Sequence, residues 1–402
     1  MPTSWPSIVK HESASLKINL DNLIRKNLSN IAFVTIDGED AKDFDDAVFC
    51  VEHNDGYDLY VAIADVSLYV KPESSIDKEA INRGTSIYFP NFVIPMLPEI
   101  LSNNLCSLRP NEDRPSLVVK INLDKDCYLK KYNFFSAIIH SHARLTYTEV
   151  ENNSFESPLS NAVIDSLKNL KSLAHKRIAI KEERGAVRIH SKEHLIKIND
   201  DGTSKSISFR KNTFANQMIE ECMLLANECA ADLLNNRYGY APFRIHEEPD
   251  KLKLETLKKI LGGNVQLQNA RDPASQINNI SEKISAKDQL KQSLILQTMK
   301  RAEYSTENVG HFGLQLDQYC HFTSPIRRYP DLLTHRMIKS CIEDDDDYSG
   351  NKKNDQELCE ISSKLEHRAE NASRKVNQIL IFDYLKRHVG ESFEGVISGV
   401  TE

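Results

Sequence analysis

The stretch TIDGEDAKDFDDAV, residues 35–48, decides how this 402-residue chain is interpreted. Between residues 37 and 46, six acids against one lysine give a local net charge of −5. The apolar runs at 31–36 and 47–53 on either side are typical of buried strands. Two like charges ~4 Å apart cost ~4 kcal/mol at an effective dielectric constant near 20. The sequence therefore predicts a site for Mg²⁺, which prefers carboxylates, water and phosphates, with a solvated acidic turn as the alternative.

Two comparisons bear on that prediction. The run EDDDD at 343–347 is equally acidic but has polar loop residues on both sides, so we expect a solvated surface loop there. An EF-hand would need Gly at loop position six and Glu at position twelve. Counted from Asp37, those positions hold Lys42 and Val48, which excludes an EF-hand.

The composition is that of a soluble globular protein, with 40% hydrophobic and 27% charged residues. There are 51 basic and 58 acidic residues, a net charge of −7, so bulk charge does not indicate a nucleic-acid binder. Eight cysteines without a CxxC pair argue against zinc knuckles and thioredoxin-type motifs, and Cys222 and Cys229 are expected in the core. Without a signal peptide or a membrane-spanning run, we expect a cytoplasmic protein with reduced thiols and no membrane partner.

Periodicity and turn signals divide the chain into strands and helices. Residues 85–115 hold five prolines and are expected to form turns, and residues 1–30 form a polar, weakly patterned lead-in. Strands are expected at 31–36, 47–53, 57–64, 117–123 and 134–142. Helices are expected at 159–184, 212–235, 281–304, from Pro330 onward, and at 355–388.

A second informative segment is HFTSPIRRYPDLLTHR, residues 321–336. Ser324-Pro325 makes a turn, and Arg327 and Arg328 follow it just before the helix opened by Pro330. Arginine guanidinium groups match phosphate oxygens with two parallel hydrogen bonds. The segment therefore indicates a phosphate ligand, the alternative being surface or structural arginines.

Together these two segments resemble the ribonuclease II / ribonuclease R family of 3′→5′ exoribonucleases, in its catalytic domain. Further blocks at 83–110, 216–227 and 299–316 follow in the family's order, and the resemblance extends over 31–388. The runs at 93–108 and 321–336 are closer to the ribonuclease R branch. The resemblance implies an α+β fold in which helices surround a mixed or antiparallel sheet and enclose an RNA channel.

For the chemistry, the resemblance implies hydrolysis of single-stranded RNA from its 3′ end to nucleoside 5′-monophosphates. It implies Mg²⁺, with Mn²⁺ as a possible substitute, at a two-metal site in which the ions activate water and stabilise the leaving oxygen. Arg327 matches the arginine that holds the scissile phosphate, and Asp45 matches the aspartate that is critical for cleavage. The metal ligands implied are Asp37, Asp43, Asp45 and Asp46.

The resemblance also suggests RNA contacts. Tyr88 matches the tyrosine that packs on the terminal nucleotide, although taken alone it would be a core aromatic beside Phe89. Arg328 and Glu221 are further candidates, with a solvated helix face as the alternative for Glu221. Three histidines, His311, His321 and His335, are expected to orient or pack in the site wall rather than to act as general bases.

The chain departs from the family pattern in two segments and in length. Arg184-Gly185-Ala186 is followed by VRIH, residues 187–190, in place of an acidic and aromatic pair, and residues 372–376 read ASRKV in place of AERDV. The end of the chain, GESFEGVISGV at 390–400, resembles the opening strand of a C-terminal OB-fold domain. We therefore expect a lead-in at 1–30, a catalytic domain at 31–388 and a truncated OB-fold start at 389–402, with weakened RNA affinity.

Three functions stay open at this stage. The first is an active exoribonuclease that binds a single-stranded RNA 3′ end as a monomer. The second is a catalytically weak or inactive RNA-binding fragment on the same fold. The third is a Mg²⁺-dependent phosphatase or nucleotide-binding enzyme of a different family. The sequence argues against it, because it has no GxxxxGK[ST] loop and no GxGxxG motif after a strand.

Overall fold

The structure is a computed structural model, and the residues it describes are 2–18, 20, 23–189, 194–199, 201–261, 272–285, 288–342, 350–393 and 395. Three expectations fall partly or wholly outside these residues. They are the solvated loop at 343–347, the altered segment at His190, and most of the OB-fold start at 389–402.

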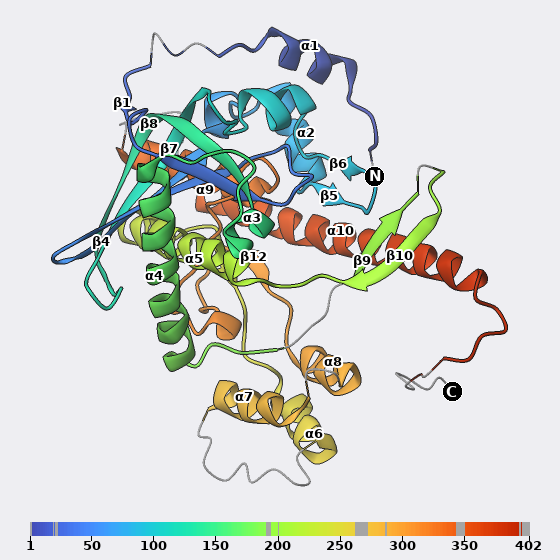
Figure 1. The fold of residues 1–402 in the computed structure, drawn as a ribbon. Coiled ribbons are helices and arrows are strands. Elements are labelled where there is room, and N and C mark those ends of the chain that lie inside the picture. Colours follow the sequence, from blue (N-terminus) through green and yellow to red (C-terminus); the bar gives the residue numbers. More distant parts are fainter. Residues whose placement is uncertain are drawn as a thin grey trace.

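The fold is built around a six-stranded mixed sheet, which lies at the upper left in Figure 1. Its strands lie in the order β1-β8-β2-β3-β4-β7, and β7 also pairs with β8, so the sheet curls round on itself through this strand. The pairings of β8 with β1 and β2 are parallel and the others are antiparallel. The strands are β1 (Lys26–Asn27), β2 (Phe33–Asp37), β3 (Asp46–His53), β4 (Gly56–Ala64), β7 (Asp113–Leu123) and β8 (Leu129–Thr146). The α+β fold and the predicted strands are confirmed, with β7 and β8 longer than expected.

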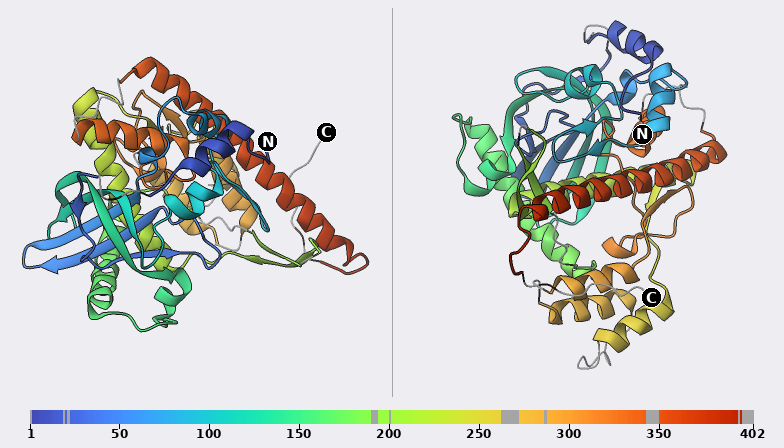
Figure 2. Two further views of the ribbon diagram at one scale, coloured as in Figure 1. Left: turned by 90° about the horizontal axis from the view of Figure 1, so that it is seen from above. Right: turned by 90° about the vertical axis from the view of Figure 1, so that its right-hand side faces the viewer.

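Helices pack on both faces of this sheet. Apart from those in residues 251–298, the α-helices of the described residues are α1 (Ser7–Ser15), α2 (Ser75–Arg83), α3 (Tyr147–Asn152), α4 (Asn161–Glu183), α5 (Phe214–Tyr238), α9 (Tyr329–Ile342) and α10 (Lys352–Lys386). Three two-stranded sheets are made by β5 (Ile87–Tyr88) with β6 (Val93–Ile94), β9 (His194–Ile198) with β10 (Ser204–Phe209), and β11 (Phe243–Ile245) with β12 (Glu303–Ser305). The first two are hairpins, whereas β11 and β12 are far apart in the sequence. The long helix α10 runs along one side of the molecule (Figure 2).

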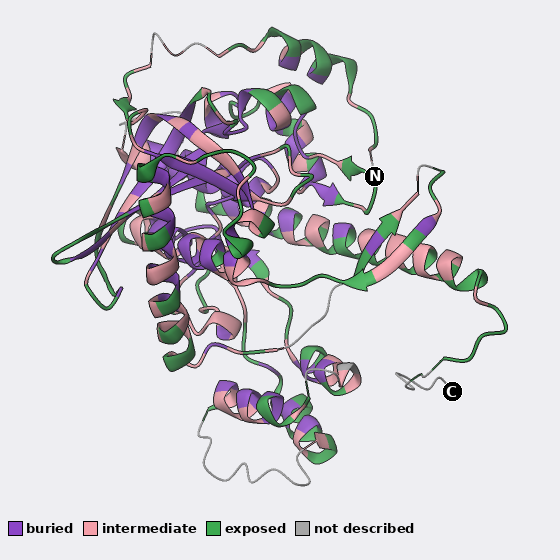
Figure 3. Cartoon of the chain, in the orientation of Figure 1, coloured by how far each residue is buried: buried purple, intermediate pink, exposed green. Residues whose placement is uncertain are grey.

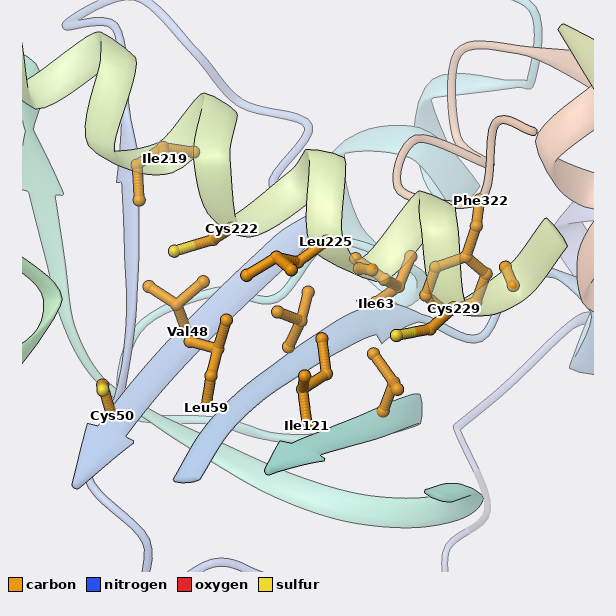
Figure 4. Close-up of a cluster of buried hydrophobic side chains, with 14 of the residues drawn as sticks. Val48, Cys50, Leu59, Ile63, Ile121, Ile219, Cys222, Leu225, Cys229 and Phe322 are labelled. Atoms are coloured by element: carbon orange, nitrogen blue, oxygen red, sulfur yellow. The ribbon is translucent and has the colours of Figure 1, made fainter. Parts of the chain in front are cut away.

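The larger hydrophobic core lies between the sheet and α5. Alternate residues of β4, among them Leu59 and Ile63, point toward the apolar face of α5 that carries Cys222 and Cys229 (Figure 4). Both cysteines are fully buried, as predicted, and all eight cysteines are free. Buried residues concentrate on the sheet and on the helix faces turned toward it (Figure 3). The spacing of three and four residues along α5 is what lets one face of the helix cover the sheet.

The described residues of the N-terminal segment make specific contacts with the rest of the chain. Helix α1 packs on α2, where the Glu12 carboxylate accepts a hydrogen bond from the Ser75 amide at 2.9 Å. Further along, Arg25 forms a buried ion pair with Asp65, which also pairs with Lys339 at 3.2 Å. A few specific polar contacts therefore fix this segment, although its apolar periodicity is weak.

We expect Asp65→Asn to lower the free energy of unfolding by about 3–5 kcal/mol, because Arg25 and Lys339 would be left buried without their anion. Burial opposes ionisation of Asp65, but Lys339 and Arg25 outweigh it and hold the pKa well below its ordinary value. This stabilisation is therefore complete above about pH 4 and is lost as the pH falls toward the folded-state pKa. Urea unfolding measures both effects. Asp165 forms an exposed ion pair with Lys168 and serves as the control. An equal loss of unfolding free energy in Asp165→Asn would show that burial of the charges is not the cause.

One region differs from the predicted helices. The sequence predicts one helix over 281–304, but the structure has α6 (Lys251–Leu261), α7 (Pro273–Lys283) and α8 (Gln289–Thr298), and the chain then enters β12. These three helices share a small core of their own and lie together at one end of the molecule (Figures 1 and 2). Asp288 caps the start of α8 by accepting from the Lys291 amide, a helix-start signal that apolar periodicity does not show.

Within 85–115 the prediction of turns holds in outline, with the β5–β6 hairpin and one helical turn at Leu101–Leu105 added. In the described part of the chain, no helix combines the length and apolar character that crossing a membrane requires.

Candidate active site

The acidic stretch connects two neighbouring strands of the sheet. Strand β2 ends at Asp37 and β3 begins at Asp46, and the antiparallel register places Val34 opposite Val48. This register brings Asp37 and Asp46 to the same edge of the sheet, while the loop between them carries Asp43 and Asp45. Asp45 is 6% exposed, whereas Asp40 in the same loop lies in solvent. The structure therefore separates inward-facing acids from an outward-facing one that the sequence alone could not distinguish.

The electrostatics of these acids are unfavourable on their own. Burial raises the pKa of Asp37, and the charge of Asp43 raises it further. Burial likewise raises the pKa values of Asp45 and Asp46, with Asp37 adding to the effect on Asp46. One carboxylate oxygen of Asp37, Oδ2, is buried and has no hydrogen-bond partner among the described residues. Such a group is costly unless a cation compensates it.

The arginine segment reaches this edge of the sheet from the other half of the chain. The amide of Ile326 donates a hydrogen bond to Asp45 Oδ1 at 2.8 Å, across 281 residues of sequence. The charge of Arg327, the next residue, lowers the pKa values of Asp37, Asp45 and Asp46, partly offsetting the effect of burial. Arg327 Nη2 also donates to the Ser324 hydroxyl at 3.1 Å. The turn that carries Arg327 is thus bonded directly to the acidic loop.

A buried aspartate that the sequence analysis did not single out fixes this turn. Asp331 is fully buried, and its Oδ1 accepts from the Ser324 amide at 2.8 Å and from Arg328 Nη2 at 2.7 Å. The Arg327 carbonyl in turn accepts from the Ser86 amide at 2.9 Å. Asp331 holds the turn that carries the Ile326 amide and Arg327. Its position in the first turn of α9, just after Pro330, was the available signal.

Tyr88 lies at the site rather than in the core. It ends β5, its side chain is 44% exposed, and its hydroxyl donates to Asp43 Oδ2 at 2.6 Å. Its neighbour Phe89 stacks instead on Phe92, with ring centroids 4.6 Å apart. An exposed ring tied to one of the acids has a face free for a planar ligand.

We expect Tyr88→Ala to weaken binding of single-stranded RNA by about 1–3 kcal/mol, the value of one stacked base. Tyr88→Phe keeps the ring and loses only the hydrogen bond to Asp43, so its affinity should stay close to that of the parent chain. Fluorescence anisotropy with a labelled oligonucleotide measures both. Equal losses in the two variants would show that the hydroxyl, not the ring, makes the contact.

Two predicted RNA contacts are engaged elsewhere. Glu221 is 2% exposed on α5 and pairs with Lys181 of α4 at 3.2 Å, so the alternative of a solvated helix face is wrong for it. Arg328 is turned to Asp331, and its side chain is mostly covered. Both residues thus hold elements around the site together, and their contacts with RNA stay a prediction.

The three histidines orient or pack, as expected. His335 is buried and its Nε2 hydrogen-bonds the Phe322 carbonyl at 2.8 Å. His311 Nδ1 accepts from the Leu314 amide at the start of a short helical turn. His321 Nδ1 is 2.7 Å from the Tyr304 hydroxyl.

Each segment that departs from the family pattern has a local structural role. Arg188 pairs with Glu282 of α7 at 2.7 Å and with Glu182 of α4 at 3.3 Å. With Val187 and Ile189 packed on the α6–α8 core, this segment attaches that core to the rest of the fold. In the second segment, Ser373 Oγ lies 3.5 Å from the Tyr88 carbonyl, so α10 runs beside the tyrosine.

The donor set suits a hard divalent cation in its chemistry. Carboxylate oxygens are the ligands of Mg²⁺ and Mn²⁺, and the unpartnered Oδ2 of Asp37 is one such donor. Within the described ranges, no three acidic, histidine or cysteine side chains form a ready-made metal cage. Asp37, Asp43, Asp45 and Asp46 are the candidate donors for such an ion, and water or a substrate phosphate would have to complete its shell.

Clustered carboxylates beside an arginine are typical of metal-dependent enzymes that act on phosphate esters. The chain belongs to the RNB domain family, whose profile matches residues 25–344. It is 39% identical to ribonuclease R of Vibrio parahaemolyticus over 433 aligned residues, covering all of this chain and 51% of the relative. The chain thus spans about half the length of that relative, and the predicted resemblance to ribonuclease R is confirmed.

Solved structures agree on the fold. Mycoplasma genitalium RNase R in complex with ribose-methylated single-stranded RNA superposes with a TM-score of 0.93 at 32% identity, over all of this chain and 65% of that one. Yeast Ssd1, described as a pseudonuclease, superposes with a TM-score of 0.69 at 21% identity, over 88% of this chain and 45% of that one. The second likeness shows the fold alone.

Proposed function

We propose that this chain is a Mg²⁺-dependent 3′→5′ exoribonuclease that hydrolyses single-stranded RNA to nucleoside 5′-monophosphates. The single observation that carries the proposal is the hydrogen bond from the Ile326 amide to Asp45, which joins the acidic loop to the arginine turn. Family membership and the likeness to an RNA-bound RNase R support the choice of RNA as substrate.

In this proposal the acids, Arg327 and Tyr88 each have a separate role. Asp37, Asp43, Asp45 and Asp46 would hold the divalent ions, which supply an activated water and stabilise the leaving 3′-oxygen. Asp45 keeps one oxygen on the Ile326 amide, so its remaining oxygen is held in a fixed direction. Arg327 offers its guanidinium to the scissile phosphate, and its charge offsets the negative charge that builds up there. The ring of Tyr88 stacks on the terminal base without selecting its identity.

The same chain supplies every one of these groups, so we propose that it acts as a monomer. The pairing of Asp43 with Tyr88 places the stacking ring directly beside the acids. A terminal nucleotide held there has its phosphodiester bond within reach of the acids, which favours cleavage one nucleotide at a time.

A second candidate is an RNA-binding protein without nuclease activity. The likeness to yeast Ssd1 favours it only at the level of the fold, because that fold occurs in a pseudonuclease. This chain carries all four aspartates and Arg327, which favours the enzyme.

A 5′-labelled single-stranded RNA separates the two candidates. The exoribonuclease gives a ladder that shortens from the 3′ end, with 5′-mononucleotides as the product, and chelation of divalent ions by EDTA stops it. Binding of the RNA without any shortening would support the second candidate and overturn the first.

A further inference from the structure

We propose that His321 is an RNA-binding residue, whose neutral ring donates its Nε2 hydrogen to an oxygen of the strand next to the scissile phosphate, with Tyr304 fixing the ring. This inference rests on the proposed function. The observation behind it is the hydrogen-bonded pair of Tyr304 and His321 at the edge of the site. Tyr304 is buried, whereas Nε2 of His321 is not.

The buried end is Tyr304. It is 4% exposed in β12, and its hydroxyl lies 2.7 Å from His321 Nδ1. The guanidinium of Arg244 covers the ring of Tyr304 at 4.6 Å, and Arg244 is itself held by two hydrogen bonds to Glu366 of α10. The tyrosine is thus fixed from both sides and cannot turn its hydroxyl to solvent.

The direction of this hydrogen bond follows from what each atom can do. A tyrosine hydroxyl has one hydrogen to donate, and a neutral imidazole carries a hydrogen on only one nitrogen. In the part of the chain that the structure describes, His321 Nδ1 is the recorded partner of the Tyr304 hydroxyl. If Nδ1 were the donor, the tyrosine hydrogen would be buried without an acceptor, which is costly. Tyr304 therefore donates to Nδ1, and the hydrogen of the ring sits on Nε2.

The open end of the pair is that Nε2 group. His321 is half-buried. Among the described residues its Nε2 has no hydrogen-bond partner, and it is not one of the fully buried polar atoms. Its N–H is therefore available at the surface of the site.

The surroundings of His321 indicate what it meets. Burial lowers the pKa of His321 well below its ordinary value, and the charges of Arg328, Arg244 and Arg327 lower it further, so the ring is neutral. Arg244 and Arg328 have their own carboxylate partners. His321 lies three residues before Ser324, in the turn whose Ile326 amide binds Asp45 and whose Arg327 donates to the Ser324 hydroxyl. An N–H donor at this place suits a phosphate or ribose oxygen of the bound strand.

Binding of a fluorescent single-stranded oligoadenylate tests the proposal, with Asp45→Asn as the parent so that the RNA stays intact. We expect His321→Phe to weaken binding about fivefold, the value of one neutral hydrogen bond. His321→Gln, which keeps an N–H donor, should stay within about twofold of the parent. Tyr304→Phe, which leaves the ring but frees its orientation, should fall between them.

The salt dependence identifies the contact as neutral. Each phosphate contact made by a cation contributes about 0.7 to the slope of log Kd against log salt on a single strand. His321→Phe should leave that slope unchanged, whereas Arg327→Met should reduce it. His53→Phe, at the far end of β3, is the matched control for the substitution and should change nothing. Melting temperatures exclude unfolding as a cause.

The outcomes separate the two proposals. If the parent binds RNA and Arg327→Met weakens it but His321→Phe does not, the assignment of His321 is overturned and the proposed function stands. If the parent binds no RNA, the proposed function itself fails.

If His321→Phe does weaken binding, replacing the last riboses of the oligonucleotide by deoxyriboses locates the contact. A His321→Phe effect that persists places it on a phosphate, and one that disappears places it on a 2′-hydroxyl.

Discussion

We expect Asp45→Asn to abolish RNA cleavage and at the same time to make the fold more stable. Asparagine has nearly the same shape and keeps an oxygen to accept from the Ile326 amide, so only the charge is lost. The cleavage rate should fall about a thousandfold or more, which corresponds to about 4 kcal/mol of transition-state stabilisation. Single-turnover cleavage of a labelled RNA in Mg²⁺ measures this loss.

The stability of the same variant tests the electrostatic argument separately. Burial raises the pKa of Asp45, which means that the folded chain disfavours the ionised carboxylate at neutral pH. Removing that charge should therefore raise the melting temperature in the absence of divalent ions. Asp40→Asn is the matched control, because Asp40 lies in the same loop but in solvent. It should cleave RNA at the parent rate, and a comparable loss there would point to the net charge of the loop instead.

Replacement of Arg327 has the second-largest expected effect. Arg327→Met should lower the cleavage rate about 10²–10³-fold, the usual cost of removing one donor that stabilises transition-state charge. Arg327→Lys keeps the charge but loses the planar pair of donors, so its loss should be smaller. Arg387→Met, in an exposed ion pair at the end of α10, is the control and should have no effect.

In these variants the pH dependence of the cleavage rate should shift in a defined direction. The charge of Arg327 lowers the pKa values of Asp45 and Asp46. Without that charge the carboxylates hold their protons to higher pH, so the acidic limb of the pH–rate profile of Arg327→Met should move upward. Arg327→Lys should leave the limb where it is in the parent chain. An unmoved limb in both variants would show that Arg327 does not act on the carboxylates.

Much of the fold could be predicted from the sequence because the sheet is built from strongly patterned strands. Alternation in β4 and the helical spacing in α5 are local signals, and both led to the observed elements. The α6–α8 region could not be predicted, since its small core is shared by three short helices and by residues as distant as Phe312. Docking of the N-terminal segment through Arg25 was likewise invisible, because a single ion pair leaves no periodicity.

The candidate site shows the same division. The charge of the acidic loop pointed to the aspartates, whereas Tyr88 and the role of Arg327 followed from the family resemblance. The structure joins Asp43 to Tyr88 and Asp45 to the turn that carries Arg327. Sequence could not separate Glu221 from a solvated helix face, because its burial depends on a lysine of a different helix. Asp331 and Tyr304 were missed for a related reason. Their importance lies in what they hold, Ser324 and His321, which only the folded chain reveals.

Binding of Mn²⁺, followed by electron paramagnetic resonance in the presence of a non-cleavable single-stranded RNA, tests the role of the acids most directly. The wild-type chain should immobilise the ion, and a chain carrying Asp37→Asn together with Asp46→Asn should bind it far more weakly, with its melting temperature maintained. Equal uptake of Mn²⁺ by both chains would contradict the claim that these carboxylates form a metal centre.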